Sequence, residues 1–315
     1  MVGKSEVDVI VTEDFVIGMP QLALGGLSEN WLLKECGNQH WIALAKCLGL
    51  PTPDFINQQG QKMYAAFLVV KITKAAFGQV YENNLLTIKT GLQRVTSSRS
   101  YSHHEIHVKG QCIAHVELLS SFVNRTEEGN NQSVARGEVF KGEWFACEAA
   151  TLMMKEHKAG RAVTDNVSDE SSTYKYQPCP YSDFNGADFL YFAQFQAVMD
   201  RAERHIQMTS NNTQMNRRLW QTFERTICYY GNINLDDSLT VSLQDLRFTS
   251  ASNMKTEVNK ELNDEIAHIG RLHRRSDNSL IANIHTRKVH MEHPLSLFQV
   301  SLISNDGHEK KEEIK

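Results

Sequence analysis

The sequence predicts an α+β fold made of two copies of one unit, because the same three landmarks occur twice in the same order. Each copy has a Gly-containing turn that leads into a helical pattern, then a turn that leads into a strand, then another apolar strand. The landmarks are Gly25–Leu32, Gly78–Ile88 and Cys112–Val116 in the first half, and Asp183–Leu190, Gly231–Val241 and Leu280–Ile284 in the second. The second set lies about 150 to 170 residues after the first, as expected of a duplication that has gained loop insertions. Two α+β units in one chain predict a fused pseudo-dimer with its own internal interface.

Length and composition are those of an ordinary globular protein of two domains, with 315 residues, 41% hydrophobic and 22% charged. A formal net charge of -4 gives no sign of a nucleic-acid surface, and no apolar run approaches the length needed to span a bilayer. The N-terminus lacks the basic-then-apolar order of a signal peptide, and the six cysteines include no C-x-x-C pair. We therefore expect a cytoplasmic protein with reduced cysteines and neither a nucleic-acid nor a membrane partner.

The expected domain boundaries follow from the repeat and from a polar stretch between its copies. Residues 1–160 form the N-terminal unit and residues 181–305 the C-terminal unit, joined by a linker at 161–180 that is rich in Ser, Asp and Pro. Residues 306–315 form a charged tail, which we expect to be disordered.

The first helix is the element that the sequence predicts most clearly. Ser28 is a candidate N-cap, Glu29 suits the positive end of the helix dipole, and apolar residues follow a period of about 3.6 as far as Leu48. Gly49 and Pro51 end the pattern.

The second helix is expected from about Ala187 to Ile206, with an apolar face that includes Phe192 and Met199. Strands are expected at 7–14, 65–72, 85–90, 103–108, 112–122, 224–230, 238–246, 267–273 and 280–287.

Metal and nucleotide cofactors are not predicted. His103 and His107 lie in one strand and would be roughly 13 Å apart at about 3.3 Å per residue, too far to bind one ion. No Gly-rich phosphate loop or dinucleotide fingerprint is present. The segment that begins at Gly25 has Asn30 where a nucleophile elbow would need its second Gly, which argues against a serine hydrolase.

The start of the first helix is a candidate binding site for a thioester carbonyl. Amides at a helix N-terminus lack internal partners and carry partial positive charge, and glycine lets a substrate oxygen approach closely. Gly25, Gly26, Leu27 and Ser28 occupy this position. The alternative is that the glycines only make a turn.

Several segments resemble known families. Asp183–Phe192, followed by Asp200-Arg201-Ala202, resembles the start of the central helix in hotdog-fold thioesterases. Four further segments are more specific, and together they resemble the double-hotdog acyltransferase/decarboxylases of polyketide biosynthesis, of the leinamycin-pathway type: Gly18–Leu22, Gly25–Glu35, Met63–Phe67 and Arg271–Arg274. The resemblance implies a double hotdog, in which two central helices are each wrapped by a curved antiparallel sheet.

The resemblance also implies a reaction and its partners. Methylmalonyl-CoA, or a related malonyl-type thioester, loses CO2, and the resulting enolate deprotonates a tyrosine that becomes an acyl-O-Tyr ester. The acyl group then passes to the phosphopantetheine thiol of an acyl carrier protein, with coenzyme A as substrate rather than resident cofactor. The matching tyrosine is Tyr64, and Gly26, Leu27 and Ser28 would supply amide donors. We expect one active site at the first helix start, and such chains could also pair as homodimers.

Two other functions remain open at this point. A thioesterase or dehydratase of the same fold would use Asp183 or Asp188 near the second helix start. A non-catalytic hotdog protein would only bind acyl thioesters. The sequence does not identify the acyl group, the carrier protein or the pathway.

Overall fold

The computed structural model describes residues 9–142, 144–162, 173–209, 219–249 and 264–291. The expected tail at 306–315 lies outside these ranges, as do residues 163–172 in the middle of the expected linker. The two ends of the linker are described: they contain the last residues of a helix and, after residue 172, the strand β9 and the short helix α3. The division at 161–180 itself stays a prediction.

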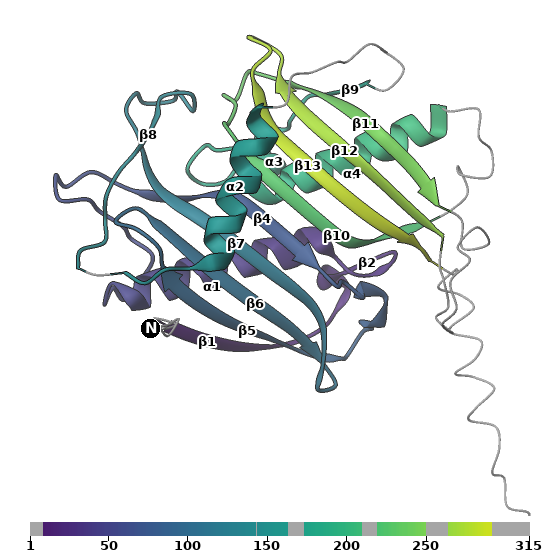
Figure 1. The fold of residues 1–315 in the computed structure, drawn as a ribbon, viewed down its shortest axis with the longest axis horizontal. Helices are drawn as coiled ribbons and strands as arrows, with labels where there is room; N and C mark the ends of the chain where they lie inside the picture. The colour runs from purple at the N-terminus through teal and green to yellow at the C-terminus, as the bar shows by residue number, and fades with distance from the viewer. Residues whose placement is uncertain (1–8, 143, 163–172, 210–218, 250–263, 292–315) are drawn as a thin grey trace, which may run out of the picture.

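Strands of both halves form one large antiparallel sheet (Figure 1). Its strands are β1 (Val9–Val16), β4 (Tyr64–Thr73), β5 (Leu85–Arg94), β6 (Arg99–Val108), β7 (Gln111–Arg125), β8 (Val134–Arg136), β9 (Thr173–Tyr176), β10 (Trp220–Tyr229), β11 (Leu239–Thr249), β12 (Glu265–Arg274) and β13 (Leu280–His290). The short strands β2 (Leu22–Ala23) and β3 (Gly26–Leu27) form a separate hairpin, and single 3-10 turns lie at Met19–Gln21 and Phe77–Gln79.

The strand order shows the duplication directly. The path through the sheet is β1-β5-β6-β7-β4-β10-β13-β12-β11-β9, so the second half repeats the order of the first in reverse about the central β4–β10 pair. That pair runs from Val69 opposite Cys228 to Ile72 opposite Arg225. The two halves are therefore related by a pseudo-twofold axis between β4 and β10. The chain is a double hotdog, as predicted.

The first central helix matches its prediction. Helix α1 spans Glu29–Cys47, and the Ser28 Oγ accepts a hydrogen bond from the Trp31 amide at 3.3 Å. Gly49 follows with a φ of 68°, a conformation that favours glycine and ends the helix.

The second central helix begins later than predicted. Helix α4 spans Phe192–Thr209, whereas the expected start was Ala187. The Asn185 Oδ1 accepts hydrogen bonds from the amides of Ala187 and Phe189, at 3.0 and 3.1 Å. This side chain replaces the helical partners of those amides and holds residues 185–190 as a tight loop.

Helices cover both faces of the sheet, as Figure 1 shows. Helices α1 and α4 lie side by side on the inner face, where the Asn30 Nδ2 donates to the Ala193 carbonyl at 2.9 Å. On the outer face, helix α2 (Glu148–Ala162), which was not predicted, crosses the junction between the halves. Its residues Ala150 and Met153 pack on Val69 and Cys228, one from each half, so α2 buries the joint between them.

Candidate active site

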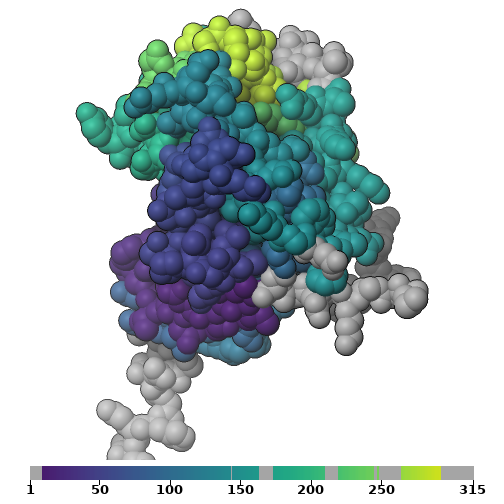
Figure 2. All heavy atoms as spheres, turned by 90° about the vertical axis from the view of Figure 1, so that its left-hand side faces the viewer, coloured from purple at the N-terminus to yellow at the C-terminus, as the bar shows by residue number. Residues whose placement is uncertain are grey.

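A cavity of about 630 Å³ lies at the junction of the two halves. Its walls come from the start of β4, the loop before α4 with the first turn of that helix, the end of β10 and the hairpin between β12 and β13. The aromatic, aliphatic, cationic and amide side chains of the wall include Trp41, Lys62, Tyr64, Arg161, Asn185, Phe189, Leu190, Tyr191, Phe192, Tyr229, Tyr230 and Asn232. Figure 2 views the side of the molecule on which blue and teal segments of the first half meet green and yellow segments of the second.

Tyr64 lies in the wall of this cavity, at the first residue of β4. Its ring meets the Phe189 ring edge-on at a centroid distance of 5.6 Å, and the Arg125 guanidinium lies 4.5 Å from the centroid of the Phe189 ring. Within the described ranges, the Tyr64 hydroxyl has no hydrogen-bond partner. The hydroxyl is therefore available to a ligand while the ring is held by packing.

The loop before α4 is fixed from several directions. The Asn232 Oδ1 accepts from the Leu190 amide at 2.9 Å, and the Asn131 Nδ2 donates to the Asp188 and Ile233 carbonyls at 2.6 and 2.7 Å. Arg125 donates to the Asn131 Oδ1 at 2.7 Å and to the Ala187 carbonyl. The polar walls of the cavity are thus built before any ligand arrives.

Hydrogen-bond donors face the cavity at this loop. The Asn185 Oδ1 is held by two backbone amides, so the orientation of its side-chain amide is set, and its Nδ2 has no acceptor among the residues described. Phe192 lines the cavity, and its amide belongs to the first turn of α4, where no helical carbonyl is available to accept from it. A thioester oxygen bound here would meet these donors at the positive end of the helix dipole.

No carboxylate, imidazole or thiol from the described residues lines the cavity. The Asp183 carboxylate is 4% exposed and accepts from the Tyr176 hydroxyl and the Cys179 amide, both at 2.7 Å. Asp188 has a left-handed φ of 61° in the tight loop and is not part of the wall. Neither acid is placed to act as a general base on a ligand in the cavity.

Four tyrosines line the cavity, and their hydroxyls differ. Tyr229 donates to the Phe192 carbonyl at 3.0 Å and Tyr230 to the His157 carbonyl at 3.1 Å, and burial raises the pKa of both phenols. Burial, together with the charge of Glu35, raises the pKa of Tyr191 to about 12. Tyr64 is therefore the candidate nucleophile of the four.

The residues expected at the first helix start do not join Tyr64. None of Gly25, Gly26, Leu27 and Ser28 lines the cavity. Trp41, which does line it, lies twelve residues after Glu29 along α1, which is about 18 Å at 1.5 Å per residue. The single site expected from Tyr64 and the first helix start is thus split between two places, and Tyr64 faces the start of the second helix instead.

The segment Gly25–Ser28 has structural partners. Gly26 and Leu27 pair with Ala23 and Leu22, and the Ser28 amide donates to the Gln21 carbonyl at 2.8 Å. A Cβ on Gly26 would lie 2.2 Å from the Phe77 carbonyl oxygen, so only glycine fits this φ of 105°. Leu24 and Gly25 form the turn of this hairpin, and Gly26 is the first residue of β3.

The pseudo-twofold axis explains the split. It relates α1 to α4 and the start of β4 to the start of β10, so the counterpart of Tyr64 is Trp220. At that second position the Gln221 Nε2 donates to the Gly25 carbonyl at 3.0 Å, and the Met291 Sδ would lie 2.9 Å from a Cβ on Gly25. Side chains of the second half therefore fill the space beside the first helix start.

A buried ionic cluster, which the sequence did not reveal, also lies beside the first helix start. The Arg225 Nε lies 2.8 Å from the Glu29 Oε1, and the Arg225 Nη2 lies 2.7 Å from the Asp200 Oδ1. Lys288 contacts Asp200 and Glu203, each at 2.8 Å. Burial raises the pKa of Glu29, and the charge of Arg225 opposes that rise. The cluster joins α1 of the first half to α4, β10 and β13 of the second.

Other cavity residues were also missed from the sequence. Asn131 lies outside every expected helix and strand, and Asn232 belongs to the landmark Gly231–Val241, to which no role was assigned. In the sequence, both residues lie close to glycines in segments typical of turns. Asn is common in turns that have no functional role, so this pattern does not identify them as cavity residues. In the folded chain, the turns that contain Asn131 and Asn232 both contact the loop before α4.

Solved structures of known proteins share this fold. The chain is similar to a 12:0-ACP thioesterase from Umbellularia californica, with a TM-score of 0.58 and 8% identity over 90% of this chain and 94% of that one. It is also similar to an acyl-ACP thioesterase from Bacteroides thetaiotaomicron, with a TM-score of 0.53 and 12% identity over 89% of this chain and 97% of that one. No protein-family model and no curated protein sequence matches the chain. Among the helices of the described ranges, none has both the length and the apolar character to cross a bilayer.

Proposed function

We propose that this chain is a bifunctional acyltransferase/decarboxylase. It would decarboxylate a malonyl-type CoA thioester such as methylmalonyl-CoA and pass the acyl group through Tyr64 to an acyl carrier protein. One observation carries the proposal: the unpartnered Tyr64 hydroxyl lies in a cavity whose described walls contain no carboxylate, imidazole or thiol. The chemistry of this family needs no separate base, because the substrate generates its own.

The first step breaks the bond between the carboxylate and the α-carbon. The electron pair passes into the thioester, whose oxygen becomes an enolate. Asn185 Nδ2 and the Phe192 amide, in the first turn of α4, are the donors that we assign to this oxygen, in place of Gly26, Leu27 and Ser28. Preorganised donors of this kind are usually the largest contribution to such a reaction.

The second step uses the enolate as the base. Ionising a free phenol at neutral pH costs about 4 kcal/mol, and an enolate formed beside it is basic enough to take the proton. The α-carbon takes the phenol proton, and the Tyr64 phenolate attacks the thioester carbonyl and expels CoA as the thiolate, which takes a proton from solvent. The carrier-protein thiol then attacks the Tyr64 ester and takes the acyl group. Lys62 and Arg161, also in the cavity wall, supply positive charge for an anionic substrate.

The Tyr64→Phe variant tests the proposal, because it removes one hydroxyl and keeps the ring that packs on Phe189. It should still release CO2 and form propionyl-CoA from methylmalonyl-CoA, but transfer to the carrier protein should be lost. Tyr230→Phe is the matched control: it removes a hydroxyl from the same wall, and that hydroxyl donates to the His157 carbonyl. Chromatography of CoA products and the mass of the carrier protein give both readouts. Normal loading of the carrier protein by Tyr64→Phe would contradict the proposal.

Thioester hydrolysis is the second candidate function. Two similar structures are named as acyl-ACP thioesterases, which also favours a carrier-protein thioester as ligand. The position of Asp183 weakens this candidate, because its carboxylate is held by Tyr176 and Cys179 outside the cavity. Free acid and free CoA, formed equally by wild type and Tyr64→Phe, would favour it. Binding without turnover would favour a non-catalytic thioester-binding protein.

A further inference from the structure

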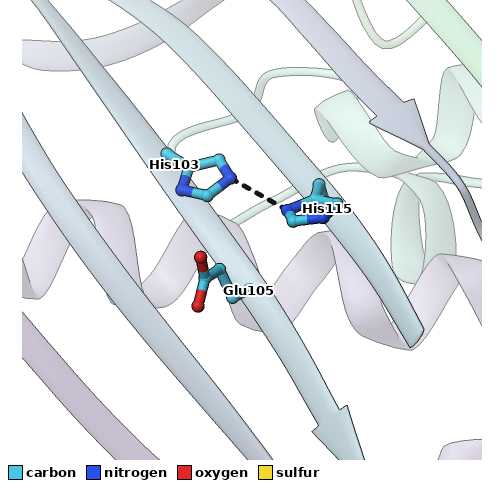
Figure 3. Close-up of side chains that lie close together, drawn as sticks. All are labelled: His103, Glu105 and His115. Carbon is cyan, nitrogen blue, oxygen red and sulfur yellow. Dashed lines mark hydrogen bonds between the residues drawn. The ribbon is translucent and has the colours of Figure 1, made fainter. Parts of the chain in front are cut away.

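We propose that His103, Glu105 and His115 form a binding site for Zn²⁺ on the outer face of the sheet (Figure 3). His103 and Glu105 project from β6 and His115 from the neighbouring strand β7. One ligand atom from each side chain lies within 4.8 Å of the other two. The site is separate from the cavity and from Tyr64, so it goes beyond the proposed function.

The strand pairing brings these three residues together. Glu105 lies directly opposite His115, and His103 lies two residues before Glu105 on the same face of β6. Sequence reasoning compared His103 only with His107 along one strand and so missed His115 across the sheet. The expectation of no metal rested on that comparison.

The two imidazoles already have the separation that zinc requires. The His103 Nε2 lies 3.1 Å from the His115 Nδ1, and Figure 3 shows these nitrogens turned toward each other. Donor atoms around a tetrahedral zinc lie roughly 3.3 Å apart, because each Zn–N bond is about 2.0–2.1 Å. The separation of the two nitrogens therefore fits a tetrahedral ion once both rings turn so that their lone pairs point at the ion instead of at each other.

Neighbouring side chains orient the Glu105 carboxylate and the His115 ring. The Glu105 Oε2 lies 3.1 Å from the His107 Nε2, which leaves the other Glu105 oxygen for an ion. The His115 Nε2 lies 3.7 Å from the Cys112 Sγ, on the side of the ring away from His103. Partners of this kind orient metal ligands and increase their basicity.

The surrounding charges limit the ligand set to three protein residues. Glu117, opposite His103, accepts a hydrogen bond from the Tyr101 hydroxyl at 2.6 Å and does not belong to the group whose ligand atoms lie within 4.8 Å of one another. Lys89 lies opposite Glu105 on β5 and places a positively charged side chain beside the site. Two histidines and one carboxylate with an open fourth position form a ligand set typical of zinc.

Zinc binding to the full-length protein tests the site. Metal-free protein is titrated with zinc chloride, and bound zinc is counted by elemental analysis after dialysis. We expect one zinc per chain in the wild type and in His205→Gln, an exposed histidine on α4 that serves as the control. His115→Gln should bind at least tenfold more weakly, and circular dichroism verifies that it is folded.

X-ray absorption of the zinc-loaded wild type gives a second measurement that needs no variant. The proposal predicts only nitrogen and oxygen neighbours, at about 2.0–2.2 Å, with scattering from two imidazoles. A sulfur neighbour at about 2.3 Å would instead make Cys112 a ligand and overturn the set. Failure of the wild type to bind one zinc, or equal binding by His115→Gln, would also overturn it. Acyl transfer through Tyr64 should be the same with and without zinc, so the two proposals can fail separately.

Discussion

At the scale of single residues, the candidate site depends on two side chains that are each held at one end and have, at the other, a polar atom without a hydrogen-bond partner among the described residues. Tyr64 is fixed by its ring and has a free hydroxyl, whereas Asn185 is fixed by its oxygen and has a free nitrogen. The first is a group that can accept an acyl chain, and the second is a donor that can hold an oxyanion. Neither role is visible in the sequence without the resemblance, because a tyrosine at a strand start and an asparagine in a turn are ordinary structural residues.

Asn185→Asp tests the donor role. Aspartate keeps the oxygen that accepts from the Ala187 and Phe189 amides, so the loop and the stability should change little. It removes the Nδ2 donor and adds a negative charge beside the developing enolate. We expect CO2 release to fall by about 10²–10³-fold, the usual cost of losing one oxyanion donor. Decarboxylation at the wild-type rate would show that Asn185 only shapes the loop.

At the scale of elements, α1 is joined to the sheet by a buried hydrogen-bonded histidine. His40 is fully buried, with Nδ1 2.7 Å from the Ser102 Oγ and Nε2 2.8 Å from the Ser120 Oγ, and its ring lies against Phe67. Burial lowers the pKa of His40 to about 3. The folded protein therefore holds this imidazole neutral between pH 5 and pH 7.

This predicts a loss of stability on mild acidification. The unfolded chain binds a proton at His40 below a pKa of about 6.5, while the folded chain does not, so stability falls as pH decreases below that value. Between pH 7 and pH 5 the loss from His40 should reach about 2 kcal/mol. Urea unfolding of wild type and His40→Gln at both pH values isolates this contribution, because the other titrating groups are shared. Equal losses in the two proteins would contradict the assignment.

The elements also show how far the sequence could predict the fold. The α1 boundaries were predictable, because Ser28, Glu29 and Gly49 act on their own backbone neighbours. The α4 start was not, since Asn185 diverts the backbone into a loop that Asn131 and Asn232 hold from distant segments. Helix α2 was missed because its few buried residues, Ala150 and Met153 among them, pack on a junction that exists only after the halves pair.

At the scale of the whole molecule, the pseudo-twofold axis creates two related positions that have diverged. One is the cavity with Tyr64 at the start of α4. The other, at the start of α1, is filled by Gln221 and Met291 beside the ionic cluster. The sequence predicted one site that combines Tyr64 with the first helix start, and the structure places Tyr64 in a cavity beside the second helix start instead. The choice between the two starts depends on how the halves pair, which local patterns do not encode.

The ionic cluster should be a major contact between the halves. Arg225 is 1% exposed and faces both Glu29 and Asp200. Arg225→Met would leave the buried Glu29 carboxylate without the cation 2.8 Å from it, whereas Asp200 would keep its contact with Lys288. Breaking a buried pair costs about 3–5 kcal/mol. We expect a loss of that size in chemical unfolding. Glu29→Gln combined with Arg225→Met should cost less than the sum of the single changes, and strict additivity would show that the two residues do not interact.

The most direct test of the central claim is the covalent intermediate on Tyr64. Wild-type protein is incubated with methylmalonyl-CoA without carrier protein, and its intact mass and peptides are measured. The account predicts a mass increase of one propionyl group, mapped to Tyr64 and removed when the carrier protein is added. An acyl group on another residue, or turnover to free acid and CoA with no acylated protein under conditions that preserve tyrosine esters, would contradict it.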